Sequence, residues 1–350
     1  MNLFFEHENF FHPCVIPFRG KLILLMSKIT AMDRFTPPYF CFSEDGGKSW
    51  SKPEQIPTLK AFEKCADFRP IKLPDDNRIM IIGLVTNGAD KEAVYSGYKT
   101  VYLSFDGEWS EPKALLGKEE NNHRVACAQT ALAADGSIII PIYFDSPEKG
   151  GFKVQTRKFI LKDGSFVQTG SGNVLNSGIG NGWHEPSVTA FNGKYYLTLR
   201  CTTGCAWLAV SDDGLNWSEP QKWIFSDGTL LETGPTQQHW MHLDNKLWLV
   251  YTRKDESNED CFRWRTPMFA SPLDPEKMQL VKEKEFLVLP RIDYKTRPGL
   301  YGNFHVENCK GTVYISDAPL WFDWTADKEA IAWFSTSVVI REIKFGDLTK

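Results

Sequence analysis

The chain has 350 residues and a net charge of −4, so it lacks the basic surplus that is typical of nucleic-acid-binding surfaces. Its 24 Phe, 12 Trp and 11 Tyr supply enough aromatic surface for a sizeable core. No apolar run approaches the ~18–20 residues of a membrane-spanning helix, so we expect no membrane span.

The first residues, MNLFFEHENFFHPCVIPF, carry acids and histidines and no basic region, so they do not form a signal peptide. As written, the sequence predicts a cytoplasmic protein; a secreted or periplasmic one is the alternative if a leader was removed. Only Cys201 and Cys205, of eight cysteines, lie close together. We expect free buried thiols, with a bridge between this pair as the alternative for an exported protein. No zinc-ligand spacing occurs, so we expect no metal and no cofactor.

Strand-like apolar runs follow one another along the whole chain. They occupy 21–26, 38–43, 78–85, 100–105, 137–144, 194–200, 205–211, 246–252, 311–316 and 331–345. Turn signals such as FDGE, ADGS, FNGK and LDNK separate them. No amphipathic helix, linker or change of composition interrupts the pattern, so we predict one all-β domain over residues 1–350. We also expect the last strand to pair with N-terminal strands, which removes an exposed sheet edge.

One turn sequence recurs. SEDGGKSW begins at Ser43, SFDGEW at Ser104 and SDDGLNW at Ser211, and a fainter copy without tryptophan begins at Ser271. The gap between the second and third copies is nearly twice the others, so a degenerate copy, LKDGSF at 161–166, fills it. A period of about 55–60 residues gives about six units. We therefore predict a six-bladed β-propeller of four-stranded antiparallel blades.

The recurring turn has a structural explanation. Its Asp accepts backbone N–H groups, its Gly permits a positive φ, and its Trp covers the turn. Chemistry is therefore expected elsewhere, at the ends of the inner strands, which converge on the axis of a propeller.

Four segments carry polar residues suited to that position. Asp33 and Arg34 lie in a loop within 28–47; Glu185 precedes a strand whose hairpin partner ends at Arg200. Arg263 and Arg265 are two apart, and strand alternation would place both on one face with Trp264 opposite. Tyr301 lies just before a predicted strand. The choice between Arg263 and Arg265 stays open.

These turns and this ordered set resemble the sialidases (retaining exo-α-neuraminidases) and their Asp-box, or BNR-repeat, relatives. The resemblance spans the whole chain and implies a glycoside hydrolase that releases a terminal acidic sugar. It implies Tyr301 as nucleophile, Glu185 as its base, Asp33 as acid, and Arg200 and Arg265 as carboxylate clamps. A tyrosine nucleophile suits sialic acid, because the carboxylate on its anomeric carbon would repel a carboxylate nucleophile.

The pattern departs from this family at one point. Where sialidases carry an early Arg in a Phe/Tyr-Arg-Ile-Pro segment, this chain reads NFFHPC, so the Arg position falls on Phe11 or His12. Arg34, Arg69 or His12 would then complete the clamp. Further candidates for contacts with the sugar are His184, Gln237, Gln238 and His239.

Two other functions compete with the first. The missing Arg favours a carbohydrate-binding propeller without hydrolytic activity. The histidines His12, His184, His239 and His305 favour a glycosidase or lyase for another sugar, such as a uronate or rhamnose, with a His acid or base. In each case the expected partner is a glycan, not a nucleic acid.

Overall fold

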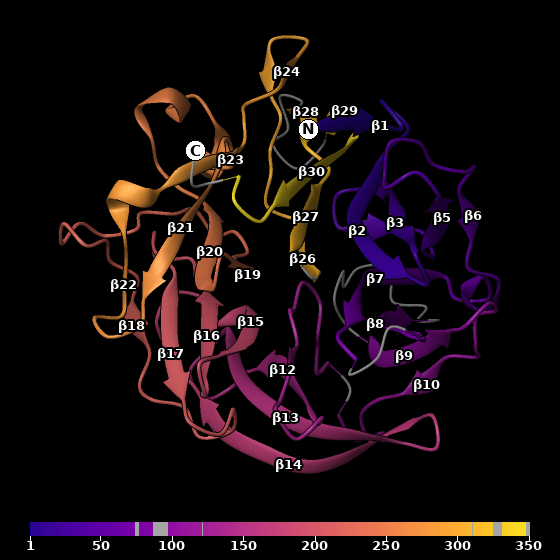
Figure 1. The fold of residues 1–350 in the computed structure, drawn as a ribbon, viewed down its shortest axis with the longest axis horizontal. Helices are drawn as coiled ribbons and strands as arrows, with labels where there is room; N and C mark the ends of the chain where they lie inside the picture. Colours follow the sequence, from indigo (N-terminus) through magenta and orange to yellow (C-terminus); the bar gives the residue numbers. More distant parts are fainter. Residues whose placement is uncertain (74–76, 87–96, 121, 310, 325–330, 348–350) are drawn as a thin grey trace.

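The protein is described by a computed structural model that covers residues 1–73, 77–86, 97–120, 122–309, 311–324 and 331–347. Six blades of antiparallel strands stand around a central axis, and the first two are joined into one sheet. The fold is therefore the predicted all-β, six-bladed propeller (Figure 1). Within these residues no helix is long and apolar enough to cross a membrane.

The blades follow one another in chain order. Blade 1 is β2 (Phe10–Phe18), β3 (Lys21–Ala31), β5 (Tyr39–Ser43) and β6 (Glu54–Gln55); blade 2 is β7 (Lys64–Ile71), β8 (Ile79–Thr86), β9 (Lys99–Phe105) and β10 (Lys113–Ala114); blade 3 is β11 (Ala131–Leu132), β12 (Ile138–Asp145), β13 (Phe152–Lys162) and β14 (Ser165–Leu175). Blade 4 is β15 (His184–Phe191), β16 (Lys194–Arg200), β17 (Trp207–Ser211) and β18 (Gln221–Lys222); blade 5 is β19 (His239–Leu243), β20 (Lys246–Thr252), β21 (Met268–Asp274) and β22 (Gln279–Leu280), with β23 (Phe286–Leu289) also paired to β21; blade 6 is β26 (His305–Cys309), β27 (Thr312–Asp317), β30 (Val338–Lys344) and β1 (Asn2–Phe4).

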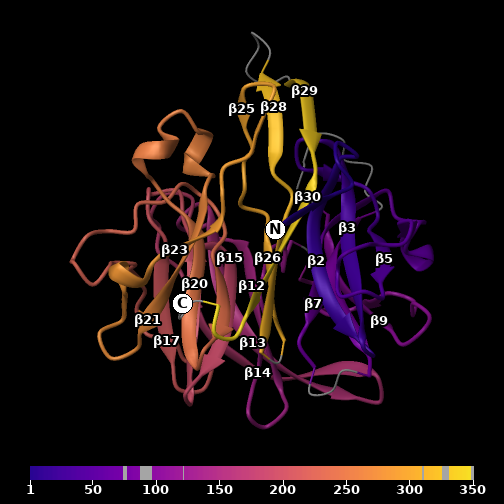
Figure 2. The ribbon, with the colours of Figure 1, turned by 45° about the horizontal axis from the view of Figure 1, so that its top comes forward.

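Short elements connect or extend the blades. They are β4 (Arg34–Phe35), which pairs with β3 and β7, the hairpins β24 (Asp293–Tyr294)–β25 (Arg297–Pro298) and β28 (Leu320–Trp324)–β29 (Ile331–Thr336), and the 3-10 turns η1 (Pro57–Leu59), η2 (Glu256–Asn258), η3 (Phe262–Trp264) and η4 (Lys282–Lys284). The β28–β29 hairpin stands above one end of the ring (Figure 2).

Ring closure follows the prediction, because β1 at the N-terminus pairs with β30. The predicted strand at 331–345 is wrong in one respect: it divides into β29 and β30, which belong to different sheets. The middle strands of a blade are covered on both faces by the neighbouring blades. For this reason β8 is a continuous apolar run with every residue buried, rather than an alternating strand.

The recurring turns have the expected structural role. Asp45 Oδ1 accepts the backbone N–H groups of Lys48 and Ser49, each at 3.0 Å, and Asp213 Oδ1 accepts those of Leu215 and Asn216. Every copy, the degenerate one at 161–166 included, joins the third strand of a blade to the fourth. The turns therefore lie away from the axis. All eight cysteines are free, and seven of them are buried.

Candidate functional site

Two cavities lie near opposite ends of the axis. One, of about 270 Å³, is lined by residues from the starts of the inner strands, including His12, Asp67, Glu185 and Asn303. We call it the axial cavity. The other, of about 420 Å³, is lined by residues near the ends of the inner strands, such as Thr189 and Asn308.

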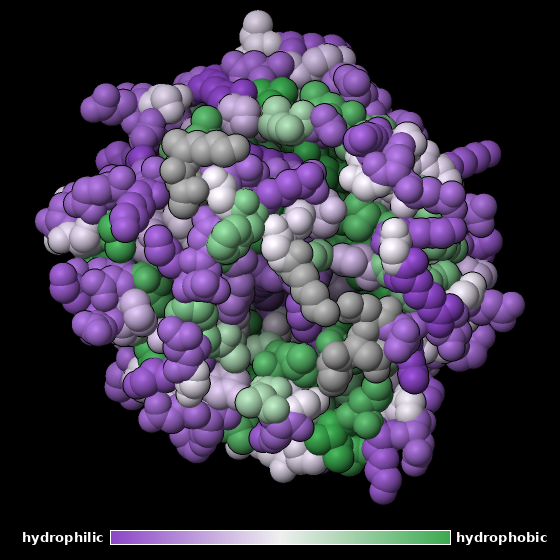
Figure 3. Space-filling view, viewed as in Figure 1, coloured by the Kyte–Doolittle hydropathy of each residue, from purple (hydrophilic) through white to green (hydrophobic). Residues whose placement is uncertain are grey.

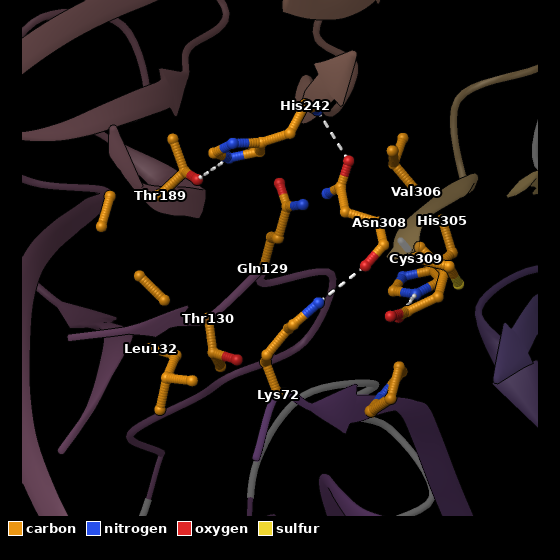
Figure 4. A pocket seen from close by; sticks show the side chains of 14 residues that line it. Lys72, Gln129, Thr130, Leu132, Thr189, His242, His305, Val306, Asn308 and Cys309 are labelled. Carbon is orange, nitrogen blue, oxygen red and sulfur yellow. Dashed lines mark hydrogen bonds and ion pairs between the residues drawn. The ribbon is translucent and has the colours of Figure 1, made fainter. Parts of the chain in front are cut away.

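The larger cavity is less well suited to chemistry, because fewer charged groups line it and these have partners (Figure 4). Lys72 Nζ donates to the Asn308 carbonyl at 2.6 Å, and Glu307 Oε2 lies 3.3 Å from His305 Nε2. The face in Figure 3 is mostly hydrophilic and hollowed near its centre. None of the predicted catalytic residues lines this cavity. The axial cavity is therefore the candidate site.

Bulged backbone turns side chains into the axial cavity. His12, Asp67 and Glu185 occupy corresponding positions near the starts of β2, β7 and β15, and each has a left-handed φ, of 52°, 49° and 45°. At each position the pairing register of the strand shifts. A left-handed conformation costs a non-glycine residue roughly 1–2 kcal/mol, and such strain concentrates at functional sites. Cys127 and Asp33 also line the cavity, and they too have a left-handed backbone, with φ of 61° and 55°.

The predicted hairpin of Glu185 and Arg200 is present. His184 is paired across the strands with Arg200, so the side chains of Glu185 and Arg200 meet in an ion pair inside the cavity. Burial alone favours the neutral carboxyl, but the Arg200 guanidinium outweighs burial and holds the pKa of Glu185 below its usual value. Glu185 is therefore ionised at neutral pH.

Three arginines surround the same space. Arg263 and Arg265 both line the cavity beside Arg200. They do not lie on a strand as predicted: η3 places Arg263 and Trp264 in left-handed conformations with φ of 56° and 51°. Burial, followed by the charges of Arg200 and Arg263, lowers the pKa of Arg265 to about 10. Its Nη2 donates to the Pro235 carbonyl at 3.1 Å, whereas its buried Nε has no hydrogen-bond partner.

The cluster of Arg200, Arg263 and Arg265 has the charge and placement to bind an anion. Two carboxylates attract the Arg263 guanidinium, those of Asp33 and Glu185. Asp33 lines the cavity and is exposed. A bound carboxylate would accept charge-assisted hydrogen bonds from the guanidinium groups and reduce their mutual repulsion.

A second network of charged side chains, more deeply buried, supports the axial cavity. Asp67 Oδ1 lies 2.8 Å from Arg69 Nε and 3.3 Å from His12 Nδ1. Arg69 also donates to the backbone carbonyls of Phe304 and Asn303. Burial, which outweighs the attraction of Asp67, lowers the pKa of His12, so its imidazole is neutral at neutral pH. Arg69 itself does not line the cavity; it holds Asp67 there.

The predicted nucleophile is not in the site. Tyr301 is fully buried outside the cavity, in an apolar cluster with Met241, Val250 and Phe304. Its hydroxyl donates to the Pro290 carbonyl at 2.7 Å, and burial raises its pKa. The structure thus does not bring Tyr301 to Glu185. Its neighbours Leu300 and Asn303 face the cavity instead.

Five other predicted contact residues also lie outside the cavity lining. Arg34 is exposed next to Asp33 but is not part of the lining. The buried ones are His184, Gln237, Gln238 and His239. Gln237 joins Asn303 to His239, through contacts of 3.3 and 3.0 Å, so it supports a lining residue. Gln238 bonds to Thr198 and to the Thr236 carbonyl.

Sequence reasoning missed the apolar lining residues and four polar ones, which are Asp67, Cys127, Tyr143 and Asn303. A usable signal existed for Asp67. It stands at the same place in its inner strand as His12 and Glu185, so aligning the inner strands with one another would have found it. Tyr143 is the tyrosine among the described lining residues, and its electrostatic effect on Arg200 places it close to that guanidinium. Among the described residues, no group of three or more His, Cys, Asp or Glu is arranged to hold a metal ion.

The buried histidines predict a pH-dependent stability. Burial lowers the pKa of His184 and of His242 to about 4. In the unfolded chain these two histidines are protonated below about pH 6.5, whereas in the folded chain they are protonated only below about pH 4. The free energy of unfolding should therefore fall as pH drops through this window, by about 1–2 kcal/mol per histidine at pH 5. Buried Asp317, whose pKa burial raises to about 6, acts in the opposite direction.

Urea unfolding at pH 7.5 and pH 5.0 measures the slope of the free energy of unfolding against pH. His184→Gln should flatten it, because that buried imidazole is then absent. An unchanged slope in His184→Gln would contradict the assignment of a buried, neutral imidazole.

Comparisons with known proteins agree with the fold. No family model matches the chain, and neither does any curated protein. A Dyadobacter fermentans protein of unknown function is similar, with a TM-score of 0.69 and 15% identity over 98% of this chain and 97% of that chain. Trypanosoma rangeli sialidase in complex with the inhibitor DANA has a TM-score of 0.64 and 13% identity, over 97% of this chain and 55% of that chain. NanB sialidase from Streptococcus pneumoniae has a TM-score of 0.61 and 11% identity, over 98% and 69%. The chain thus spans about half the length of the Trypanosoma enzyme, and at this identity the likeness shows a sialidase-type propeller fold.

Proposed function

We propose that residues 1–350 work as one propeller domain that binds a carboxylate-bearing sugar in the axial cavity and hydrolyses its glycosidic bond. The observation that carries the proposal is the convergence of Arg200, Arg263 and Arg265 on a cavity that also holds Glu185 and Asp33. The similarity of the fold to that of sialidases supports the same reaction class, since a further similar structure is Trypanosoma rangeli sialidase in complex with sialic acid.

The residues divide the work by their position and charge. The three arginines hold the substrate carboxylate, because planar guanidinium groups match carboxylate oxygens in pairs. Asp33, at the exposed side, protonates the leaving oxygen. Glu185 is ionised and takes a proton from the attacking nucleophile. Since Tyr301 is committed to the Pro290 carbonyl, we assign the attack to water, which predicts a product with inverted configuration. Retention would require another nucleophile, and Tyr143 is the tyrosine that lines the cavity.

A second candidate, sugar binding without hydrolysis, is favoured by one observation. The Glu185 carboxylate is already paired with Arg200, and Tyr301 is remote from it. In this case the cavity would bind the acidic sugar and leave its glycosides intact.

Variants at Tyr301 and Glu185 test the chemistry. Tyr301→Phe should keep kcat within about threefold of wild type and lose about 1 kcal/mol of stability, because it removes only the bond to Pro290. Glu185→Gln should lower kcat by roughly 10²–10⁴-fold, since it removes the general base. The assay is hydrolysis of aryl α-sialosides and aryl glucuronides at several pH values, with the product configuration read by NMR.

A large loss of kcat in a folded Tyr301→Phe protein would restore the tyrosine mechanism and contradict the arrangement described above. No hydrolysis of either substrate class by wild type, together with measurable binding of the free sugars, would favour the binding function.

A further inference from the structure

The axial cavity has two chemically different sides. Glu185, Arg200, Arg263 and Arg265 form one side, from blades 4 and 5, whereas Asp33 lies between β3 and β4, next to the other side. The other is an apolar wall formed by Phe11, Ile29, Phe35, Leu300, Leu320 and Phe322. These residues belong to a single hydrophobic cluster, in which Phe11 and Phe35 stack with ring centroids 5.9 Å apart and nearly parallel planes.

The wall continues with apolar lining residues that are partly exposed. Phe322 lies on β28, in the hairpin that stands above the ring in Figure 2. The Phe262 ring meets it edge-on with centroids 6.3 Å apart, although Phe262 itself is 47% exposed. Met32, 38% exposed, also lines the cavity. Large apolar side chains left exposed beside a polar site are typical of ligand-binding surfaces.

We propose that this wall binds an apolar aglycone, so that the substrate class is an acidic sugar linked to an alkyl or aryl alcohol rather than to a second sugar. The inference rests on the proposed function. The arginines hold the carboxylate on one side, and the opposite side of the ligand then contacts the wall. A second sugar there would lose hydration of its hydroxyl groups without gaining hydrogen bonds, whereas an apolar group would bury its surface.

The test compares aglycones of matched acidity, so that leaving-group chemistry does not contribute. The probes are the methyl and cyclohexylmethyl glycosides of N-acetylneuraminic acid and of glucuronic acid, with their sulfur-linked analogues for calorimetric binding. We expect the cyclohexylmethyl compounds to bind at least about tenfold more tightly than the methyl compounds, and kcat/KM to rise by a similar factor.

Phe262→Ser should reduce this preference, measured as the ratio of the two affinities, to about threefold or less, because its ring lines the cavity beside Phe322. Because Phe262 is half exposed, the variant should fold. The matched control is Phe345→Ser, at a side chain that is 65% exposed and outside the cavity lining, and it should keep the full preference.

The outcomes separate the two proposals. Hydrolysis without a preference for the larger aglycone would overturn the apolar-aglycone inference and leave the glycosidase proposal standing. A preference in binding without hydrolysis would refute the glycosidase and support the wall. Equal binding of both aglycones, absence of binding, or an unchanged preference in Phe262→Ser would each overturn the inference.

Discussion

Replacing Asp67 by Ala should lower the free energy of unfolding by about 3–5 kcal/mol. Asp67 is 2% exposed and its partner Arg69 is 1% exposed, so the substitution leaves a charged guanidinium in the interior without its carboxylate. The carbonyls of Phe304 and Asn303 remain as acceptors, but they carry no net negative charge. Urea unfolding at pH 7.5 measures the loss.

Two controls isolate the cause. Glu44→Ala removes the partner of Lys21 in a surface pair, where the side chains are 74% and 50% exposed, and should cost at most about 1 kcal/mol. The double variant Asp67→Leu/Arg69→Met removes both buried charges and should recover most of the stability. If Asp67→Ala were as stable as Glu44→Ala, the buried pair would not have the role assigned to it.

Replacing Arg265 by Met should weaken binding of a carboxylate-bearing sugar by roughly 30-fold or more, equal to about 2 kcal/mol. The same change should alter the stability of the free protein by no more than about 1 kcal/mol. The two effects differ because Arg265 is repelled by Arg200 and Arg263 until an anion arrives, and its removal relieves that repulsion while losing the bond to Pro235.

Calorimetric titration with N-acetylneuraminic acid and glucuronic acid, together with urea unfolding, measures both quantities. Arg34→Met is the matched control, since Arg34 is exposed and outside the cavity lining, and it should bind these acids as wild type does. A stability loss of several kcal/mol with unchanged affinity would mean that Arg265 is a structural residue instead.

Hairpin pairing explains why part of the site was predictable. Glu185 begins a strand and Arg200 ends its neighbour, so antiparallel pairing brings them together whatever the rest of the fold does. Asp33 was located from the order of the motifs, and the structure places it at the cavity. The recurring Asp turns were interpretable for the same local reason, because their hydrogen bonds connect residues two to four apart.

Irregular backbone explains the failures. Tyr301 lies between β25 and β26, outside both strands, so strand alternation does not decide where its side chain points. The apolar cluster between blades 5 and 6 does. The prediction for Arg263 and Arg265 relied on strand alternation, whereas in the structure a turn with left-handed residues determines their positions. Asp67 was missed because a bulge, invisible in a hydrophobic pattern, turns it toward the axis.

The sequence by itself determined the all-β class, the repeat that builds six blades, and the Glu185–Arg200 pair, since turn chemistry, apolar periodicity and hairpin pairing are local. Only the tertiary structure decided which polar side chains share the axial cavity. That choice depends on bulges, on left-handed residues and on contacts between segments far apart in the chain, such as the Asn303 carbonyl, just before blade 6, against the Arg69 guanidinium of blade 2. Closing the ring brings these groups together. The burial that results lowers the pKa values of His12 and Arg265, whereas the Arg200 guanidinium lowers that of Glu185 against the effect of burial.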